Sequence, residues 1–268
     1  MIPLSHSLVA FESKKGARFE GTGIVVAPHA VLTCAHVLSN GDASLFETTF
    51  GADNVYSAGE IRASLNGVWY SPARICFQQV PKKTNACVYT GDYCCVHFDR
   101  LPGAIPVSLC RSRRLTGNRF RAAGFTPELR GARQSSIKGV QIIQHRCDDE
   151  TGTVQEVQVE GGFPEGYSGG PVFADIESAE SSALVVGMLQ RGGTRSTRSR
   201  FLAVDAFAEF LLEQLPGISF GIFNSDPTDP ATPMPPASSP PGVVGQRVKM
   251  RDVSGSVFNI NQVAKGRE

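Results

Sequence analysis

The stretch Gly166-Tyr167-Ser168-Gly169-Gly170-Pro171-Val172-Phe173 decides the fold, because it sets a serine between glycines directly before an apolar strand. A nucleophilic serine needs a hydroxyl that stands clear of the backbone and N–H groups that face the developing oxyanion. Glycine permits such a tight path because it has no Cβ. A glycine-rich turn before a strand is also common without a catalytic role. The stretch therefore predicts a nucleophile only if a suitable histidine and aspartate lie upstream.

A suitable histidine follows the short apolar strand predicted at residues 30–33. His36 ends the sequence Thr33-Cys34-Ala35-His36, directly after that strand. A strand end holds an imidazole rigidly, as a general base requires. The remaining histidines have no such context and are interpreted as solvated or hydrogen-bonded side chains: His6, His29, His97 and His145.

The candidate aspartate is Asp92, which opens the strand-like run Tyr93-Cys94-Cys95-Val96. A carboxylate at the mouth of a buried strand is costly unless it is paired. The Nδ1–H of His36 is its candidate partner. An exposed turn aspartate is the other interpretation of a Gly-Asp pair. Asp99, at the far end of the same strand, is the alternative, and we prefer Asp92 because the apolar run follows it directly.

Composition predicts a globular all-β protein. The chain has 268 residues, of which 41% are hydrophobic and 19% charged, so it has ample length for a buried core. Short runs rich in Val, Ile and Phe are separated by Gly, Pro and Ser, which indicates strands. One helix is expected at residues 205–215, with Asp205 as its N-cap. The five arginines within residues 109–121 are interpreted as a solvated loop.

The net charge and the cysteines limit the classes of partner and compartment. The net charge of +1 gives no bias towards nucleic acid or membrane, so neither is an expected partner. Seven cysteines without a C-x-x-C pair are interpreted as buried free thiols. The first residues do not resemble a signal peptide, and no apolar run approaches the ~18 residues of a membrane span. We therefore expect a cytoplasmic, disulfide-free protein.

The last 43 residues of the chain differ in composition. We predict a folded domain over residues 1–225, a linker over residues 226–242 and a flexible tail over residues 243–268. Seven of the seventeen linker residues are proline, which favours an extended chain. Within the tail, residues 253–263 (VSGSVFNINQV) combine high β-propensity with Asn and Gln and carry no charge. That pattern predicts edge-to-edge pairing between copies, and a disordered tail is the equally open alternative.

The order His36, Asp92, Ser168 on an all-β background resembles the trypsin-like serine proteases of the chymotrypsin fold. Three motifs carry the resemblance, which covers roughly residues 5–215: TCAH (33–36), GDYCCV (91–96) and GYSGGPVF (166–173). It implies two six-stranded antiparallel β-barrels, at about residues 5–105 and 106–205, and a C-terminal helix at 205–215. The active site would lie between the barrels and need no metal or cofactor.

Carried over residue by residue, the resemblance implies a role for each motif. Ser168 would attack the scissile carbonyl, His36 would transfer the proton, and Asp92 would orient His36. The backbone N–H groups of Gly166 and Ser168 would form the oxyanion hole. The expected activity is that of a serine endopeptidase acting on protein substrates. A catalytically silent recruitment module and an HtrA-like housekeeping protease are the alternatives.

The sequence also departs from the pattern of the secreted enzymes. Tyr167 stands where they have an aspartate that pairs with a new N-terminus after zymogen cleavage, so we expect no activation by that route. The floor of the specificity pocket would be Gly162, with Glu165 near its mouth. The opposing wall, Gln190-Arg191-Gly192, carries an arginine. Preferences for basic and for acidic substrate residues both remain open.

The tail segment 253–263 resembles the amyloid-signalling motifs of bacterial effector proteins and of their NLR-like sensors. This second resemblance implies an intracellular immune effector protease that is recruited through its tail, by a sensor or by self-assembly. Bringing tethered copies together would raise their effective concentration.

Overall fold

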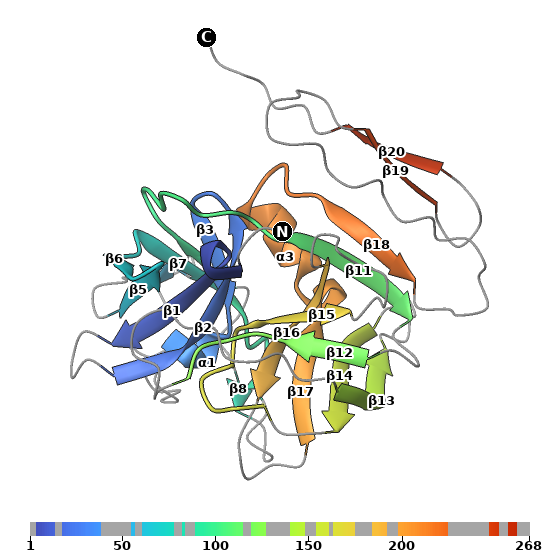
Figure 1. The fold of residues 1–268 in the computed structure, drawn as a ribbon, viewed down its shortest axis with the longest axis horizontal. Coiled ribbons are helices and arrows are strands. Elements are labelled where there is room, and N and C mark those ends of the chain that lie inside the picture. Colours follow the sequence, from blue (N-terminus) through green and yellow to red (C-terminus); the bar gives the residue numbers. More distant parts are fainter. Residues whose placement is uncertain are drawn as a thin grey trace.

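The computed structural model describes residues 4–13, 18–38, 55–56, 61–77, 82–83, 89–114, 119–126, 140–147, 154–160, 163–174, 184–191, 198–224, 247–251 and 257–261. Most of these residues form two β-sheets that lie side by side, with a short helix at their junction (Figure 1). The predicted all-β fold is therefore confirmed.

The first sheet has the order β4-β7-β10-β3-β2-β1-β5-β6. Its pairings are antiparallel. Within the described residues, no pairing joins its two edges. Its strands are β1 (Leu8–Ser13), β2 (Arg18–Ala27), β3 (Ala30–Thr33), β4 (Val55–Tyr56), β5 (Ile61–Leu65), β6 (Val68–Tyr70), β7 (Arg74–Phe77) and β10 (Cys94–His97).

The second sheet contains a closed barrel. Six strands follow the order β15-β12-β13-β14-β17-β16, and an antiparallel pairing of β15 with β16 closes the ring. This ring is the six-stranded antiparallel barrel predicted for the second half, and β11 and β18 extend it in parallel register. Its strands are β11 (Ser108–Arg114), β12 (Arg119–Ala122), β13 (Val140–Cys147), β14 (Val154–Glu160), β15 (Pro171–Ala174), β16 (Leu184–Arg191), β17 (Arg198–Ala203) and β18 (Phe220–Asn224).

The remaining elements are short. Two small antiparallel pairs join β8 (Lys82–Lys83) to β9 (Tyr89–Thr90) and β19 (Arg247–Arg251) to β20 (Val257–Asn261). The helices are η1 (Leu4–His6), α1 (Ala35–Leu38), η2 (Val204–Ala206) and α3 (Ala208–Gln214). The linker predicted at residues 226–242 lies outside the described residues. No helix in the described part of the chain is both long and apolar enough to cross a membrane.

The strands that adjoin the two main motifs were both predicted, one before His36 and one after Ser168. Residues 30–33 form β3 and residues 171–174 form β15. The interpretation of residues 109–121 as a solvated loop is wrong for residues 109–114, which lie in β11, and for residues 119–121, which lie in β12. There the side chains of Cys110 and Ser112 are buried, while Arg111 between them is partly exposed. Strand alternation explains the difference, because Arg111 lies on the opposite face of the strand from its neighbours Cys110 and Ser112.

The C-terminal helix is shorter than predicted. A 3₁₀ turn, η2, precedes α3, and Phe207 rather than Asp205 stands at its N-cap. The Asp205 carboxylate instead accepts a hydrogen bond from the Ser112 N–H at 3.0 Å. The ring of Phe210 in α3 lies 5.4 Å from that of Tyr93, so the helix covers the residue beside Asp92.

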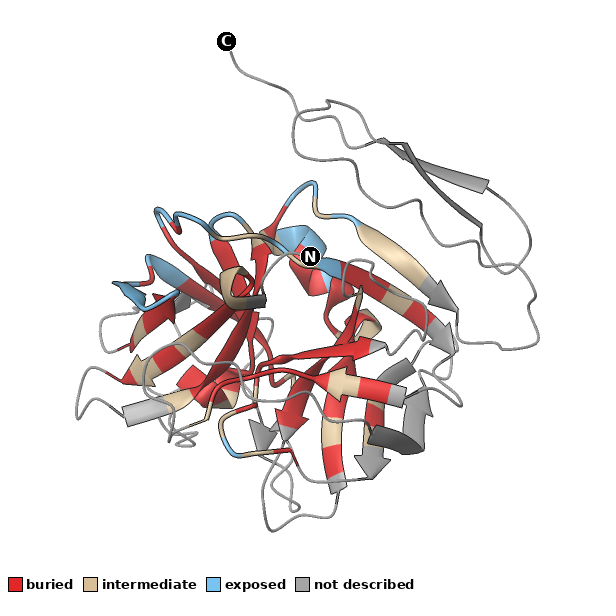
Figure 2. Ribbon diagram, in the orientation of Figure 1, coloured by how far each residue is buried: buried red, intermediate tan, exposed pale blue. Residues whose placement is uncertain are grey.

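Buried residues lie on the strands of both sheets and between them (Figure 2). One apolar cluster includes Leu32 of the first sheet, Phe173 of the second sheet and Phe210 of α3. The two sheets therefore pack together through an apolar interface. Five cysteines are buried free thiols, as predicted: Cys34, Cys76, Cys94, Cys95 and Cys110. The side chains of Cys87 and Cys147 lie outside the described set.

Candidate active site

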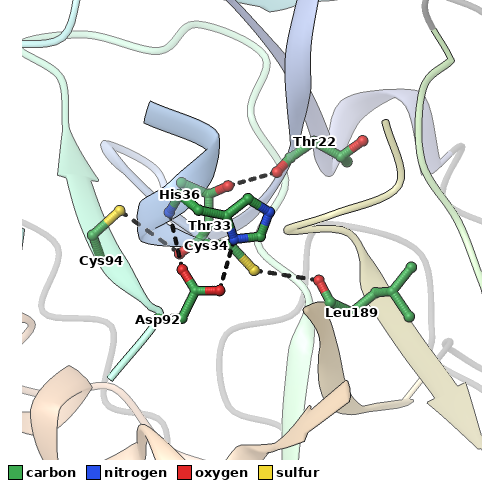
Figure 3. A network of polar contacts seen from close by, with 7 residues as sticks. All are labelled: Thr22, Thr33, Cys34, His36, Asp92, Cys94 and Leu189. Carbon is green, nitrogen blue, oxygen red and sulfur yellow. Dashed lines mark hydrogen bonds and ion pairs between the residues drawn. The ribbon is translucent and has the colours of Figure 1, made fainter. Parts of the chain in front are cut away.

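His36 and Asp92 form a tightly bonded pair. Strand β3 leads into α1, a single helical turn that carries His36. The Nδ1 of His36 lies 2.6 Å from Oδ2 of Asp92, and the His36 backbone N–H donates to Oδ1 at 2.9 Å (Figure 3). The Asp92 side chain is fully buried, whereas that of His36 is 22% exposed. The structure thus pairs His36 with the preferred aspartate, while Asp99 is exposed.

This pairing has a direct chemical consequence. A buried carboxylate is stable only with partners, and both oxygens of Asp92 have one on His36. A carboxylate at Nδ1 favours a proton on that nitrogen. The other ring nitrogen, Nε2, is then the one that can accept a proton. The imidazole is held in the tautomer and orientation that a general base requires.

The loop that carries Ser168 has an alternating pattern of backbone hydrogen bonds. The Tyr167 N–H donates to the Pro164 carbonyl oxygen at 3.4 Å. The Gly169 N–H donates to the Leu189 carbonyl oxygen at 2.7 Å, and the Gly170 N–H donates to the Tyr167 carbonyl oxygen at 2.8 Å. By contrast, no hydrogen bond in the described part of the chain is donated by the N–H of Gly166 or of Ser168. Both residues are only half-buried. These two N–H groups are therefore candidates for binding a ligand.

The backbone of this loop depends on two glycines. Gly166 and Gly169 have φ angles of +92° and +83°, which a residue with a Cβ rarely adopts. A Cβ on Gly169 would lie 2.0 Å from the carbonyl oxygen of Thr22 in β2. The Thr22 N–H also donates to the Ser168 carbonyl oxygen at 2.9 Å. These contacts bring the Ser168 backbone against the first sheet, whose strand β3 leads to His36. No hydrogen bond between the Ser168 hydroxyl and His36 is present among the described residues.

Cys34 lies beside the His36–Asp92 pair. Its buried thiol donates to the Leu189 carbonyl oxygen at 3.3 Å (Figure 3). Burial, followed by the negative charge of Asp92, raises the pKa of the Cys34 thiol well above its usual value. The ligand atoms of Cys34, His36 and Asp92 lie within 4.8 Å of one another, so they are the candidate metal ligands. Zinc binding by a cysteine requires a thiolate, however, and the raised pKa of Cys34 keeps its thiol protonated. The arrangement therefore favours the hydrogen-bonded pair of His36 and Asp92 over a metal site.

Tyr167, directly before Ser168, is an internal anchor. Its side chain is fully buried and stacks on Phe163, with the ring centroids 6.2 Å apart and the planes 20° apart. Burial raises the pKa of the Tyr167 hydroxyl. The N–H of Phe163 donates to the buried Ser199 hydroxyl at 3.2 Å, which fixes Phe163 in turn.

The predicted specificity residues are only partly described. Glu165 is exposed in the turn before Tyr167, and Gln190 is buried in β16. Arg191 ends β16, but its side chain is not among those described. Gly162 and Gly192 lie outside the described residues. The pocket assignments therefore stay predictions.

Two residues with contacts to the site were not singled out from the sequence. Phe163 is the stacking partner of Tyr167, and Thr22 contacts the loop of Ser168. The signal for Thr22 was present, since Gly21-Thr22-Gly23 places a small polar residue between glycines within a predicted strand. Such a pattern marks the close approach of another backbone.

Comparisons with known proteins agree with this architecture. The profile of the family described as trypsin-like peptidase domain matches residues 21–188. No curated protein matches the chain. The active form of the Rv3671c protease from M. tuberculosis is 17% identical, with a TM-score of 0.52, over 82% of this chain and 85% of that chain. The scabies mite inactivated protease paralogue S-I1 is 12% identical, with a TM-score of 0.53, over 78% of this chain and 93% of that chain. An active and an inactivated protein share the fold, so activity must be argued from individual residues.

Proposed function

The chain belongs to the trypsin-like peptidase family, and from that premise we propose that it is an active serine endopeptidase. Its catalytic residues are His36, Asp92 and Ser168. The observation that carries the proposal is the double hydrogen bond from Asp92 to His36, with the carboxylate fully buried and the imidazole partly exposed. A silent binding module has no need of such a pair.

The proposed reaction is acyl transfer to Ser168 and then to water. Nε2 of His36 takes the proton of the Ser168 hydroxyl as its oxygen attacks the substrate carbonyl, and then returns that proton to the leaving amine. Asp92 stabilises the imidazolium formed in between. The N–H groups of Gly166 and Ser168 bind the oxyanion, which their lack of other partners in the described structure supports. Water, activated by His36, then hydrolyses the acyl-enzyme.

We also propose that no N-terminal cleavage is needed for activity. In the secreted enzymes that the chain resembles, the residue before the serine is an aspartate that pairs with a newly formed N-terminus. Here a buried aromatic stack of Tyr167 on Phe163 supports the same turn. The stack is part of the uncleaved chain, so the turn has its support before any processing.

Active-site labelling tests the proposed function. The full chain is expected to react with a fluorophosphonate probe and to hydrolyse casein, and Ser168→Ala is expected to do neither. An unlabelled parent chain would favour the silent recruitment module. Labelling that persists in Ser168→Ala would show that another residue is the nucleophile.

The effector role is proposed from the tail. We propose that residues 253–263 recruit the protease in the cytoplasm, by self-assembly or by an NLR-like sensor. Strand β20 lies within this segment and pairs with β19, which supports its tendency to form strands. Sedimentation of the full chain, compared with a chain ending at residue 225, tests self-assembly. Recruitment is tested by asking whether the full chain, but not the chain ending at residue 225, pulls down a sensor. Equal behaviour of the two chains in both assays would refute the effector role.

A further inference from the structure

Thr22 connects the first sheet to the loop that carries Ser168. It lies in β2 and is fully buried. Its N–H donates to the Ser168 carbonyl oxygen at 2.9 Å, and its hydroxyl donates to the Gly166 carbonyl oxygen at 2.8 Å. Its own carbonyl oxygen accepts a hydrogen bond from the Thr33 hydroxyl at 2.6 Å. Every polar atom of this residue therefore has a partner, and two partners belong to the loop.

The direction of the Thr22 hydroxyl proton is fixed as well. Oγ1 accepts a hydrogen bond from the N–H of Phe125 at 3.0 Å, so its own hydrogen is left to donate to Gly166. Phe125 follows β12 of the second sheet. One side chain of the first sheet thus joins two separate segments of the second.

These contacts fix two peptide planes of the loop. In a planar trans peptide, the C=O of one residue and the N–H of the next point in opposite directions. Holding the Gly166 carbonyl therefore directs the Tyr167 N–H towards Pro164, and holding the Ser168 carbonyl directs the Gly169 N–H towards Leu189. The peptide that carries the Ser168 N–H lies between the two fixed planes.

Gly166 is the point at which this arrangement is weakest. Its φ of +92° belongs to a turn that glycine can leave at little cost, since it populates positive and negative φ about equally. A change of φ there would rotate the Gly166 N–H relative to that of Ser168. Thr22 fixes the Gly166–Tyr167 peptide, which is one of the two peptide planes that meet at Gly166 and lies between the two oxyanion donors.

We propose that Thr22 is a positioning residue of the peptidase, whose hydroxyl fixes the Gly166–Tyr167 peptide between the two oxyanion donors. The proposal rests on the proposed function for its catalytic consequence. It adds a residue of the first sheet that orients the oxyanion donors through their backbone.

The test compares three variants of the full chain. Thr22→Val keeps the shape but removes the hydroxyl, whereas Thr22→Ser keeps the hydroxyl. Ser7→Ala is the matched control, because the buried Ser7 hydroxyl donates to the Ile105 carbonyl oxygen at 2.7 Å and takes no part in the loop contacts described above. Thr22→Val and Ser7→Ala each remove one buried hydroxyl-to-carbonyl bond, and Thr22→Val also removes the acceptor of the Phe125 N–H. Of the two variants, only Thr22→Val releases Gly166.

Two readouts are measured on each variant. Hydrogen exchange of the segment 163–170 is expected to become faster in Thr22→Val and to stay at the parent rate in Ser7→Ala and Thr22→Ser. The rate of fluorophosphonate labelling is expected to fall about tenfold to a hundredfold in Thr22→Val, because misplaced oxyanion donors stabilise the transition state less well. In Thr22→Ser and Ser7→Ala it should stay within about threefold of the parent, because the donors are still held.

The outcomes separate this proposal from the proposed function. If the parent is labelled and Thr22→Val is labelled as fast, with unchanged exchange, the role of Thr22 is refuted and the peptidase assignment stands. Equal losses of labelling in Thr22→Val and Ser7→Ala would also refute it, because they would reflect general destabilisation. If the parent is not labelled, the proposed function fails, and hydrogen exchange alone decides whether Thr22 holds the loop.

Discussion

Both carboxylate oxygens of Asp92 bind the same residue, His36, one at the imidazole Nδ1 and the other at the backbone N–H. The two contacts fix the ring of His36 and the peptide that carries it as a unit. Replacement of the carboxylate by an amide would therefore change the tautomer and the placement of the ring together.

We predict that Asp92→Asn lowers kcat for casein or peptide hydrolysis by about 10⁴-fold, because the amide favours the wrong imidazole tautomer. The matched control is Asp99→Asn, which changes an exposed aspartate just beyond the same strand and should leave kcat unchanged. Steady-state kinetics with both variants measures the difference. A comparable loss in Asp99→Asn would argue against Asp92 as the partner of His36.

Gly169→Ala should destabilise the fold far more than an ordinary glycine substitution. The new Cβ would lie 2.0 Å from the Thr22 carbonyl oxygen, so the contact between the sheets must open. Gly217→Ala is the control, because Gly217 has a similar φ of +97° but open space around its Cβ position. We expect a loss of about 1–2 kcal/mol in the control, from backbone strain alone, and several times more in Gly169→Ala. Urea denaturation monitored by circular dichroism compares the two.

Tyr167→Asp should abolish activity, because it places an unpaired carboxylate in a fully buried site. In Tyr167→Phe the ring keeps its stack on Phe163, and most of the activity should remain. Fluorophosphonate labelling of the unprocessed chain checks both variants. An active Tyr167→Asp variant would mean that the stack does not support the loop.

Stability is expected to fall in acid through His97. Burial, with help from Arg74 and His29, lowers the pKa of His97 to about 4. Because its unfolded pKa is about 6.5, the unfolded chain binds a proton that the folded chain resists, so stability declines as the pH falls from 6.5 towards 4. Between pH 6.5 and 5 this term is on the order of 1–2 kcal/mol. In His97→Gln, the urea midpoint should depend less on pH over that interval, and an unchanged dependence would contradict the assignment.

The sequence predicted the parts of the site that depend on local pattern. Strands β3 and β15 have clear apolar runs with glycine or turn residues at their ends, and the motifs of His36 and Ser168 adjoin them. The choice of Asp92 over Asp99 followed from its position at the start of an apolar run. In each case the deciding residues lie within a few positions of one another.

Features that depend on distant residues were missed. The strand character of β11 was hidden by its arginines, because Arg111 finds its partners Asp205 and Glu209 in η2 and α3. The stack of Phe163 on Tyr167 and the contacts of Thr22 likewise join segments that no local pattern links. Asp205 was predicted as an N-cap because helix caps are local, whereas its actual partner, Ser112, is 93 residues away.

The separation of 144 residues between Thr22 and Gly166 also has a consequence for biosynthesis. Contacts between such distant residues form late in folding, since the long loop between them must close first. During translation, His36 and Asp92 emerge well before Ser168. Leu189, whose carbonyl oxygen accepts hydrogen bonds from Cys34 and Gly169, emerges later still. The complete candidate site can therefore form only when most of the domain has left the ribosome, so a shorter nascent chain lacks the proposed peptidase activity.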